Sequence, residues 1–343
     1  MTPQTRRRRQ GILTALATVV GLLALATLVQ ILSGPTPDAA HPRTGTAVFP
    51  DGEQVLEAAR VIEVTLADGG YRLVRGAGGW AMDQADGYPL RDDRLATLAE
   101  GVRTLEWGEA RTRDPRKFDR LGLGDPREDG AGALITFLDG EGGVLSTLIS
   151  GRRNDEIYAR QPGEDLAFRL RGDLPPFYAR AAWMDLAVID VAAATVRAVR
   201  IEDERGERLL LARAPGDGAR DFRPAPPHEN DRLVNPLAAA GPGLALARFA
   251  PVDVKPAAAL STEALARHVT MTHDGLEVEV KAFREVDGRF VTLRAVEAGE
   301  GAAHAAAINR RASGWAFELN RTDWRDFATP VRSIVERPLI DDP

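Results

Sequence analysis

The chain has 343 residues, a formal net charge of −6 and no cysteine. The lack of cysteine excludes a disulfide framework, a thiolate nucleophile and a cysteine-based zinc site. The acidic balance argues against nucleic-acid binding, which usually needs a basic surface. A content of 44% hydrophobic and 27% charged residues is typical of a globular protein that buries a core.

An uncharged, mostly apolar run extends from Gly11 to Leu32 and directly follows Arg6 to Arg9. A bilayer core of about 30 Å needs roughly 20 apolar residues in one helix. Basic residues favour the cytoplasmic side, so we expect a cytoplasmic tail over 1–10 and a transmembrane helix over 11–33. A cleaved signal peptide is the alternative, but its apolar region is usually shorter. Whether the segment is ever cleaved stays open.

Residues 34–47 are rich in proline, glycine and alanine and predict an extended linker. The first folded unit should then begin near residue 48. Residues 92–105 predict a helix, because Leu95, Leu98 and Val102 recur at helical spacing and Asp92 or Asp93 can cap it. Strands are expected over 60–66, 71–75, 80–82, 108–113, 133–138, 144–150, 156–160 and 166–170, and a short helix over 174–183.

The pattern then restarts. Val61 corresponds to Val196 and Leu134 to Val269, and both offsets are 135 (196 − 61 and 269 − 134). Further strands are expected over 195–201, 208–213, 222–224, 249–254, 268–274, 277–283, 290–294 and 315–319, with helices over 230–239 and 322–335. We therefore predict an α+β protein: after the transmembrane helix come two tandem copies of a mostly antiparallel sheet-plus-helix unit, over 48–190 and 191–337, and a tail over 338–343.

No catalytic constellation stands out. The sequence has no G-x-S-x-G elbow, no phosphate-binding glycine loop and no H-E-x-x-H pair. His268 and His273 should point to opposite faces of one strand, which is poor geometry for a shared metal, and His41, His228 and His304 suggest no site either. We therefore assign no catalytic, cofactor-binding or metal-binding residue and expect no cofactor.

Three weaker features have competing explanations. Asp83, Asp86, Asp92 and Asp93 surround Tyr88 and are more simply a solvated loop with a helix cap than a calcium site. Residues 151–156, GRRNDE, fit a turn with surface ion pairs better than an anion site. The five tryptophans favour core packing over an aromatic ligand cleft; they are Trp80, Trp107, Trp183, Trp315 and Trp324.

Several modest motifs together resemble a bacterial family. They are Gly79-Trp80 after a hairpin, the turn Leu121-Gly122-Leu123 with Pro126 before residues 134–138, and the strand Ile157-Tyr158-Ala159-Arg160. With the N-terminal apolar run and the duplication, these resemble the DUF4340 family over about residues 48–335. The second half departs from this pattern, because residues 220–230 lack the Gly-Trp pair and no second Gly-Leu-x-x-Pro turn is present. The resemblance implies no catalytic residues; members are similar to, or encoded near, auxiliary subunits of ABC exporters of the gliding-motility type.

The leading hypothesis is a non-enzymatic accessory module of the bacterial inner membrane. The chain would cross once through Gly11 to Leu32, with its bulk in the periplasm, and would bind an ABC transporter permease or auxiliary subunit. The alternative is a periplasmic binding module that holds a small molecule, glycan or peptide in the groove between the repeats. A third hypothesis is a hydrolase with a dispersed acidic pair, which would need two buried carboxylates in one pocket.

Overall fold

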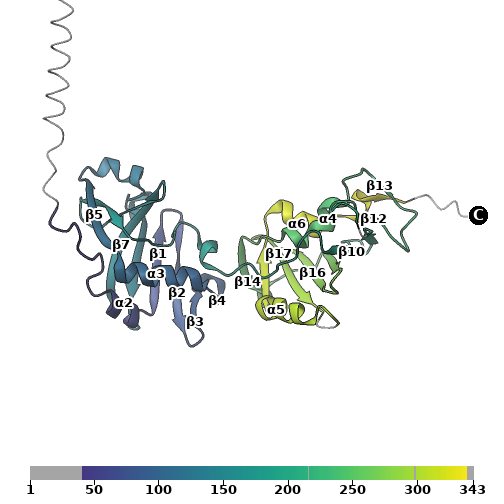
Figure 1. Ribbon diagram of the computed structural model, residues 1–343, viewed down its shortest axis with the longest axis horizontal. Helices are drawn as coiled ribbons and strands as arrows, with labels where there is room; N and C mark the ends of the chain where they lie inside the picture. Colours follow the sequence, from purple (N-terminus) through teal and green to yellow (C-terminus); the bar gives the residue numbers. More distant parts are fainter. Residues whose placement is uncertain (1–40, 215, 297–298, 338–343) are drawn as a thin grey trace, which may run out of the picture.

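The computed structural model describes residues 41–214, 216–296 and 299–337. As expected, it consists of two large, mostly antiparallel sheets with few helices (Figure 1). The predicted membrane helix from Gly11 to Leu32 and the tail over 338–343 lie outside these residues. Within the described ranges, no helix is both long enough and apolar enough to cross a bilayer.

The first sheet has nine strands in the order β4-β3-β2-β1-β6-β7-β8-β9-β5. Its central hairpin turns at Gly69, whose φ of +130° suits glycine, so that Val64 pairs with Tyr71. The strands are β1 Val61–Leu66, β2 Gly69–Gly76, β3 Gly79–Met82, β4 Tyr88–Pro89, β5 Glu106–Thr112, β6 Ala133–Leu138, β7 Val144–Arg153, β8 Glu156–Arg160 and β9 Ala167–Arg171.

The second sheet has eight strands in the order β12-β11-β10-β15-β16-β17-β18-β14. These are β10 Val196–Glu202, β11 Arg208–Ala212, β12 Arg223–Pro224, β14 Asp253–Pro256, β15 Ala266–Thr272, β16 Glu277–Arg284, β17 Arg289–Ala295 and β18 Trp315–Glu318. A separate two-stranded ribbon joins β13 Arg232–Leu233 to β19 Val335–Glu336.

The two sheets follow the same course. Without β4, the first sheet has eight strands whose chain order matches that of β10 to β18 in the second. Thr65 pairs with Leu134 in the first sheet, and Arg200 pairs with Val269 in the second. Both members of the second pair lie 135 residues after those of the first (200 − 65 and 269 − 134). The Leu134–Val269 offset therefore falls at equivalent places in the two sheets, whereas Val196 lies beyond a register shift in β10 and is displaced by one residue from the position of Val61.

Helices cover one face of each sheet (Figure 1). In the first half, α2 Gly52–Ala58 and α3 Asp92–Thr104 pack on the sheet, with Leu98 and Val102 of α3 in the core. In the second half this cover is α4 Ala240–Leu244, α5 Ala302–Ala312 and α6 Arg321–Phe327. Asn309 of α5 donates to the Ala295 carbonyl oxygen at 2.9 Å and accepts from the Ala295 amide at 2.8 Å, which ties α5 to the end of β17.

Three predicted helices were wrong, and prolines explain each error. Residues 174–183 form only a 3₁₀ turn, Arg180–Trp183, because Pro175 and Pro176 have no amide hydrogen to donate. The helix expected over 230–239 is displaced to α4, beyond Pro236. The helix expected over 322–335 ends at Phe327, shortly before Pro330. Helices α2 and α5 were not predicted.

The last residues of the linker expected over 34–47 join the first sheet, while residues 34–40 lie outside the described residues. Ala47 forms an isolated bridge to Glu106 of β5, and the Gly45 amide donates to the Trp107 carbonyl at 2.7 Å. Arg43 forms a bidentate ion pair with Glu164, with N–O distances of 2.5 and 2.8 Å. Residues 41–47 therefore belong to the first folded unit.

Candidate functional site

The two halves meet through an aromatic contact. Tyr88 of the edge strand β4 presents its ring edge-on to Trp315 of β18, with ring centres 4.9 Å apart, and to Phe317 at 6.3 Å. Only 2% of Tyr88 is exposed, and its hydroxyl donates to the Asp185 carbonyl at 2.7 Å. Its buried neighbours from both halves belong to one continuous core cluster. The junction is therefore packed like a protein interior.

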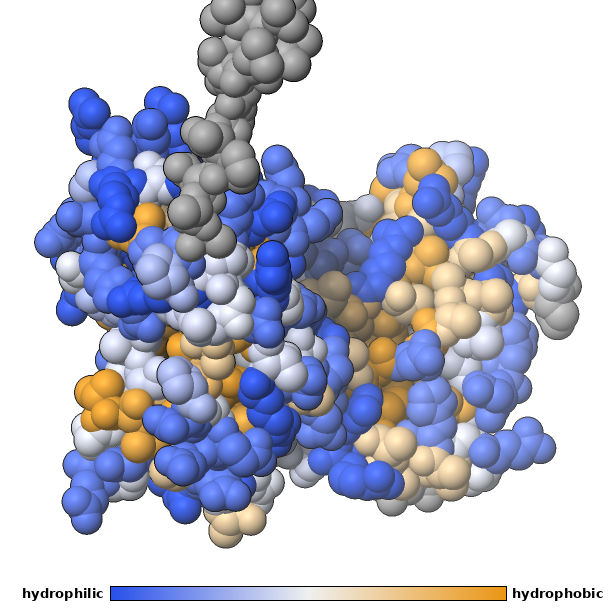
Figure 2. All heavy atoms as spheres, turned by 60° about the vertical axis from the view of Figure 1, so that its left-hand side comes forward, coloured by the Kyte–Doolittle hydropathy of each residue, from blue (hydrophilic) through white to orange (hydrophobic). Residues whose placement is uncertain are grey.

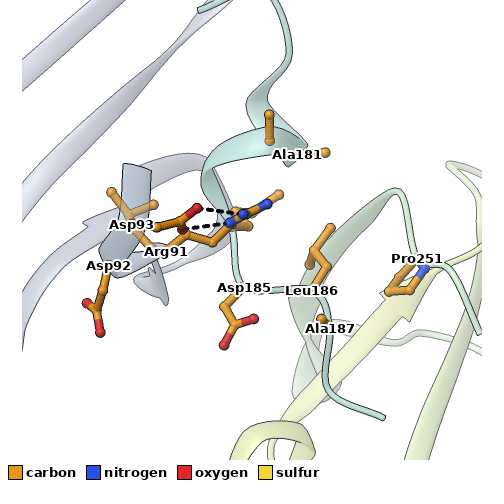
Figure 3. A pocket seen from close by; sticks show the side chains of 11 residues that line it. Arg91, Asp92, Asp93, Ala181, Asp185, Leu186, Ala187 and Pro251 are labelled. Atoms are coloured by element: carbon orange, nitrogen blue, oxygen red, sulfur yellow. Dashed lines mark hydrogen bonds and ion pairs between the residues drawn. The ribbon is translucent and has the colours of Figure 1, made fainter. Parts of the chain in front are cut away.

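A cleft of about 690 Å³ opens beside this junction. Its walls come from the start of α3, from the segment 181–187 that leads to the second half, and from Pro251. In Figure 3, Arg91, Asp92 and Asp93 lie on one side, with Leu186, Ala187 and Pro251 opposite and Asp185 between them. The surface is also hollowed between the two halves in Figure 2, where apolar side chains line the recess. We call the space of about 690 Å³ with these walls the junction cleft; its lining residues are Leu90, Arg91, Asp92, Asp93, Ala181, Ala182, Met184, Asp185, Leu186, Ala187 and Pro251.

Backbone pairing holds the walls of the junction cleft in place. Leu90 forms an isolated bridge to Met184, and the Arg91 amide donates to the Trp183 carbonyl at 2.8 Å. The chain therefore brings the start of α3 beside a segment about 90 residues later in the sequence. On the far side, Arg311 of α5 donates to the Ala187 carbonyl at 2.8 Å.

The charges at the junction cleft are partly paired. Arg91 donates twice to Asp93, at 2.9 and 2.7 Å, which lowers the pKa of that carboxyl and raises the pKa of the guanidinium. Asp185 lies 3.7 Å from the Arg311 guanidinium. The Asp92 carboxylate points away from the Arg91–Asp93 pair (Figure 3). Three aspartates and one arginine leave the lining with a formal charge of −2.

The ionisable side chains of this lining are three carboxylates and one guanidinium. Its eleven residues include no histidine, serine, threonine or lysine, so the junction cleft holds no hydroxyl or amine nucleophile beside a histidine base. None of its three carboxylates is buried. Elsewhere in the described residues the one buried acid is Asp203, which accepts from three backbone amides, those of Arg205, Glu207 and Val331. The acidic pair that the hydrolase hypothesis needs is therefore not assembled at this site.

The acidic residues near Tyr88 do not converge. Asp83 lies 3.5 Å from Arg72, and Asp86 has φ +49° at the end of a 3₁₀ turn. Asp92 and Asp93 were expected to cap α3, but the residue before the helix is Arg91, so both aspartates lie in its first turn. Carboxylates there still favour the helix dipole. The cluster therefore separates into a turn and a helix start.

The turn over 151–156 joins β7 to β8, as the sequence indicated. Asn154 and Asp155 have φ values of +47° and +62°, which fit a tight two-residue hairpin turn. Arg152 pairs with Asp173 at 2.9 Å. This segment is a turn with a surface ion pair.

The histidines are dispersed. His268 is completely buried, and its Nε2 donates to the Pro242 carbonyl at 2.9 Å, whereas His273 is exposed beyond the end of β15. Burial lowers the pKa of His268 to about 4. Among the described residues, no group of three or more histidine, aspartate or glutamate side chains is placed to hold a metal.

The tryptophans belong mainly to cores. Trp107 packs on Phe168 at 5.0 Å and Trp183 on Phe177 at 5.4 Å, while the Trp324 ring nitrogen donates to the Phe290 carbonyl at 3.3 Å. Trp315 borders the junction through its ring, and Trp183 through its carbonyl group. The sequence did not point to the joint role of Tyr88, Trp315 and residues 184–187, because nothing local links positions so far apart.

The comparisons with known proteins identify a family without assigning an activity. No curated protein matches the chain, and no solved structure does. The profile of the domain of unknown function DUF4340 matches residues 80–266, from β3 of the first sheet to the start of β15. This match is shorter than the resemblance over residues 48–335, but it covers every residue of the junction cleft. The chain belongs to the DUF4340 family.

Proposed function

We propose that this protein is a non-enzymatic interaction module, anchored in the bacterial inner membrane by residues 11–33, with its sheets in the periplasm. It would serve a membrane complex of the ABC transporter type by binding a permease or an auxiliary subunit. The observation that carries this proposal is the junction cleft, an open and acidic space beside a packed joint of two sheets.

The junction cleft has properties that suit a protein partner. Its walls are fixed by the Leu90–Met184 bridge, so little order has to be gained on binding. Its carboxylates, Asp92 and Asp185 among them, favour a partner segment that carries lysine or arginine. The uncharged run from Gly11 to Leu32 supports a location at a membrane, where such a partner would be met.

A second candidate is a binding module for a small molecule, glycan or peptide. The volume of about 690 Å³ favours it, since ligand pockets commonly measure about 300–1,000 Å³ and often lie between domains. The acidic lining would then select a cationic ligand.

Purification of the full-length protein from native membranes in mild detergent, with mass spectrometry of the co-purifying proteins, tests the first candidate. We expect an ABC permease or auxiliary subunit to be enriched. The variant Asp92→Lys should reduce this enrichment, whereas Glu141→Lys, at the exposed β6–β7 turn, should preserve it.

Deletion of residues 1–33 separates capture by the membrane segment from capture by the sheets. If the full-length protein is recovered alone, the accessory role is abandoned, and cationic ligands are screened against the junction cleft. If the partner binds Asp92→Lys as strongly as the unaltered protein, the cleft is not its docking site.

A further inference from the structure

A second hollow, of about 420 Å³, lies in the other half of the molecule. It is bordered by the β16–β17 hairpin, by α6 and by the turn after β10. Four arginines line it, with Glu204 as the single acid; they are Arg284, Arg289, Arg321 and Arg325. We call these four side chains the arginine pocket.

The backbone places these arginines in two neighbouring pairs of like charge. Arg284 and Arg289 are direct cross-strand partners in the β16–β17 pairing. Arg321 and Arg325 lie four residues apart on α6, which places them on the same helix face. Both arrangements are unfavourable for two cations in the absence of a counter-ion. Within the described residues, none of the four forms an ion pair with a carboxylate.

Three nearby acids are engaged elsewhere, whereas Glu318 and Asp326, which do not line the hollow, interact electrostatically with Arg289 and Arg325. Glu285, next to Arg284, accepts from the hydroxyl groups of Ser261 and Thr262, both at 2.5 Å. Asp287 pairs with Lys255 at 3.2 Å, and Asp323 accepts from the Asn320 amide at 2.6 Å. The lining therefore has a formal charge of +3 (four arginines minus Glu204), in a chain whose net charge is −6.

We propose that the arginine pocket binds a phosphate-bearing ligand. Guanidinium groups match phosphate oxygens with two parallel hydrogen bonds. A phosphate monoester carries about −1.5 to −2 charges, so it compensates the arginine pocket better than a single carboxylate does. The Arg284 guanidinium stacks over the Trp324 ring, with its central carbon 5.2 Å from the ring centre, and this contact orients the side chain.

The hollow is larger than one phosphate needs, so the ligand carries an organic body or a second phosphate. Two sources offer this chemistry: a soluble phosphate compound and the headgroup of a phospholipid. Both present unesterified phosphate oxygens to the guanidinium groups, but the headgroup of a phosphatidylglycerol is a diester and carries a single negative charge.

Isothermal titration calorimetry on the full-length protein in neutral detergent tests the proposal. The probes are pyrophosphate, glycerol 3-phosphate and dihexanoylphosphatidylglycerol. At least one should bind to the unaltered protein and at least tenfold more weakly to the double variant Arg284→Gln/Arg289→Gln. Arg294→Gln is the matched control, because Arg294 lies exposed on β17, the strand of Arg289, and does not line the hollow.

Preference for the short-chain lipid over glycerol 3-phosphate would assign the pocket to a headgroup, and the reverse preference to a soluble phosphate. Without ligand, the double variant should melt at the same temperature as the unaltered protein or higher, since it removes a repulsion. If it melts lower, Arg321→Gln and Arg325→Gln repeat the test from α6. The proposal is overturned if no probe binds, or if the pocket variants bind as tightly as Arg294→Gln.

Discussion

The two sheets share their strand order but differ on the face that the helices leave uncovered, here called the outer face. The pairing register identifies equivalent positions in the two sheets. The pair Leu134–Ile149 of the first sheet corresponds to Val269–Glu279 of the second. Likewise, Gly151–Tyr158 corresponds to Lys281–Thr292. In the first sheet all four positions are buried. In the second, Val269 is buried as well, but Lys281 is exposed and Glu279 pairs with Arg267. Equivalent strands therefore tolerate opposite polarity on this face.

The cause lies in one connection. Between β5 and β6, residues 113–132 pack over the outer face, and Phe118 and Leu123 join Leu134 and Ile149 in a small second core. Between β14 and β15, the corresponding connection has only residues 257–265. Because the described part of the second half forms no comparable second core, the outer face of its sheet can carry charge.

Glycines make this cover possible. A Cβ on Gly151 would lie 2.3 Å from the carbonyl oxygens of Leu121 and Gly122, so only glycine lets the connection approach β7 this closely. Gly122 itself has φ +67°. The Leu-Gly-Leu turn that marks the family resemblance is therefore a packing device of the first half.

Removal of the centre of this second core should have the largest effect. Leu123 is fully buried, so Leu123→Ala should lower the free energy of unfolding by about 2–5 kcal/mol. Leu260, in the shorter connection of the second half, is only partly buried, so Leu260→Ala should cost less. Urea denaturation of both variants measures the difference, and equal losses would contradict the role given to the cover.

Acid should destabilise the second half through His268. The equivalent position in the first half, 135 residues earlier (268 − 135), is Ala133, which does not titrate. The pKa of buried His268 is about 4 in the folded protein, against 6.5 ordinarily, so folding favours the neutral ring. Its contribution to stability is complete above pH 6.5 and is lost as the pH falls from 6.5 to about 4. The loss is about 3 kcal/mol.

Unfolding free energies measured at intervals from pH 7 to pH 4 check this expectation. His268→Gln keeps an amide donor for the Pro242 carbonyl but does not titrate, so its stability should vary less over this range. Hydrogen exchange should show that the acid-induced opening begins in the second sheet. Identical pH profiles for the variant and the unaltered protein would refute the assignment.

The third change compares the outer faces directly. Gly151→Ala should destabilise by about 1–3 kcal/mol, because its methyl group meets backbone atoms that must move. Lys281→Ala at the equivalent exposed position should stay within about 0.5 kcal/mol. Thermal melts of the two variants give the contrast, which disappears if residues 113–132 do not pack tightly on β7.

Most strands were predictable from the sequence because their signal is local, but the two-residue strands β4, β13 and β19 were not predicted. The hairpins around Gly69 and Asn154 followed from turn residues between β-rich runs. The predicted helix ends were wrong where a proline stops a helix that the composition favours, as at Pro236 and Pro330. The candidate site was not predicted for another reason. Tyr88 and Trp315 are 227 residues apart in the sequence (315 − 88), and no local pattern at either position predicts their contact.

The smallest expected effect concerns the joint between the halves. Tyr88→Phe keeps the ring against Trp315 but removes the hydroxyl that donates to the Asp185 carbonyl at 2.7 Å. Burial raises the pKa of Tyr88, so this hydroxyl stays a donor at neutral pH. Its loss should cost about 1 kcal/mol. Hydrogen exchange should then show faster opening of residues 184–187 while both sheets keep their protection. If both sheets lose protection together, the hydroxyl couples the halves more strongly than one hydrogen bond explains.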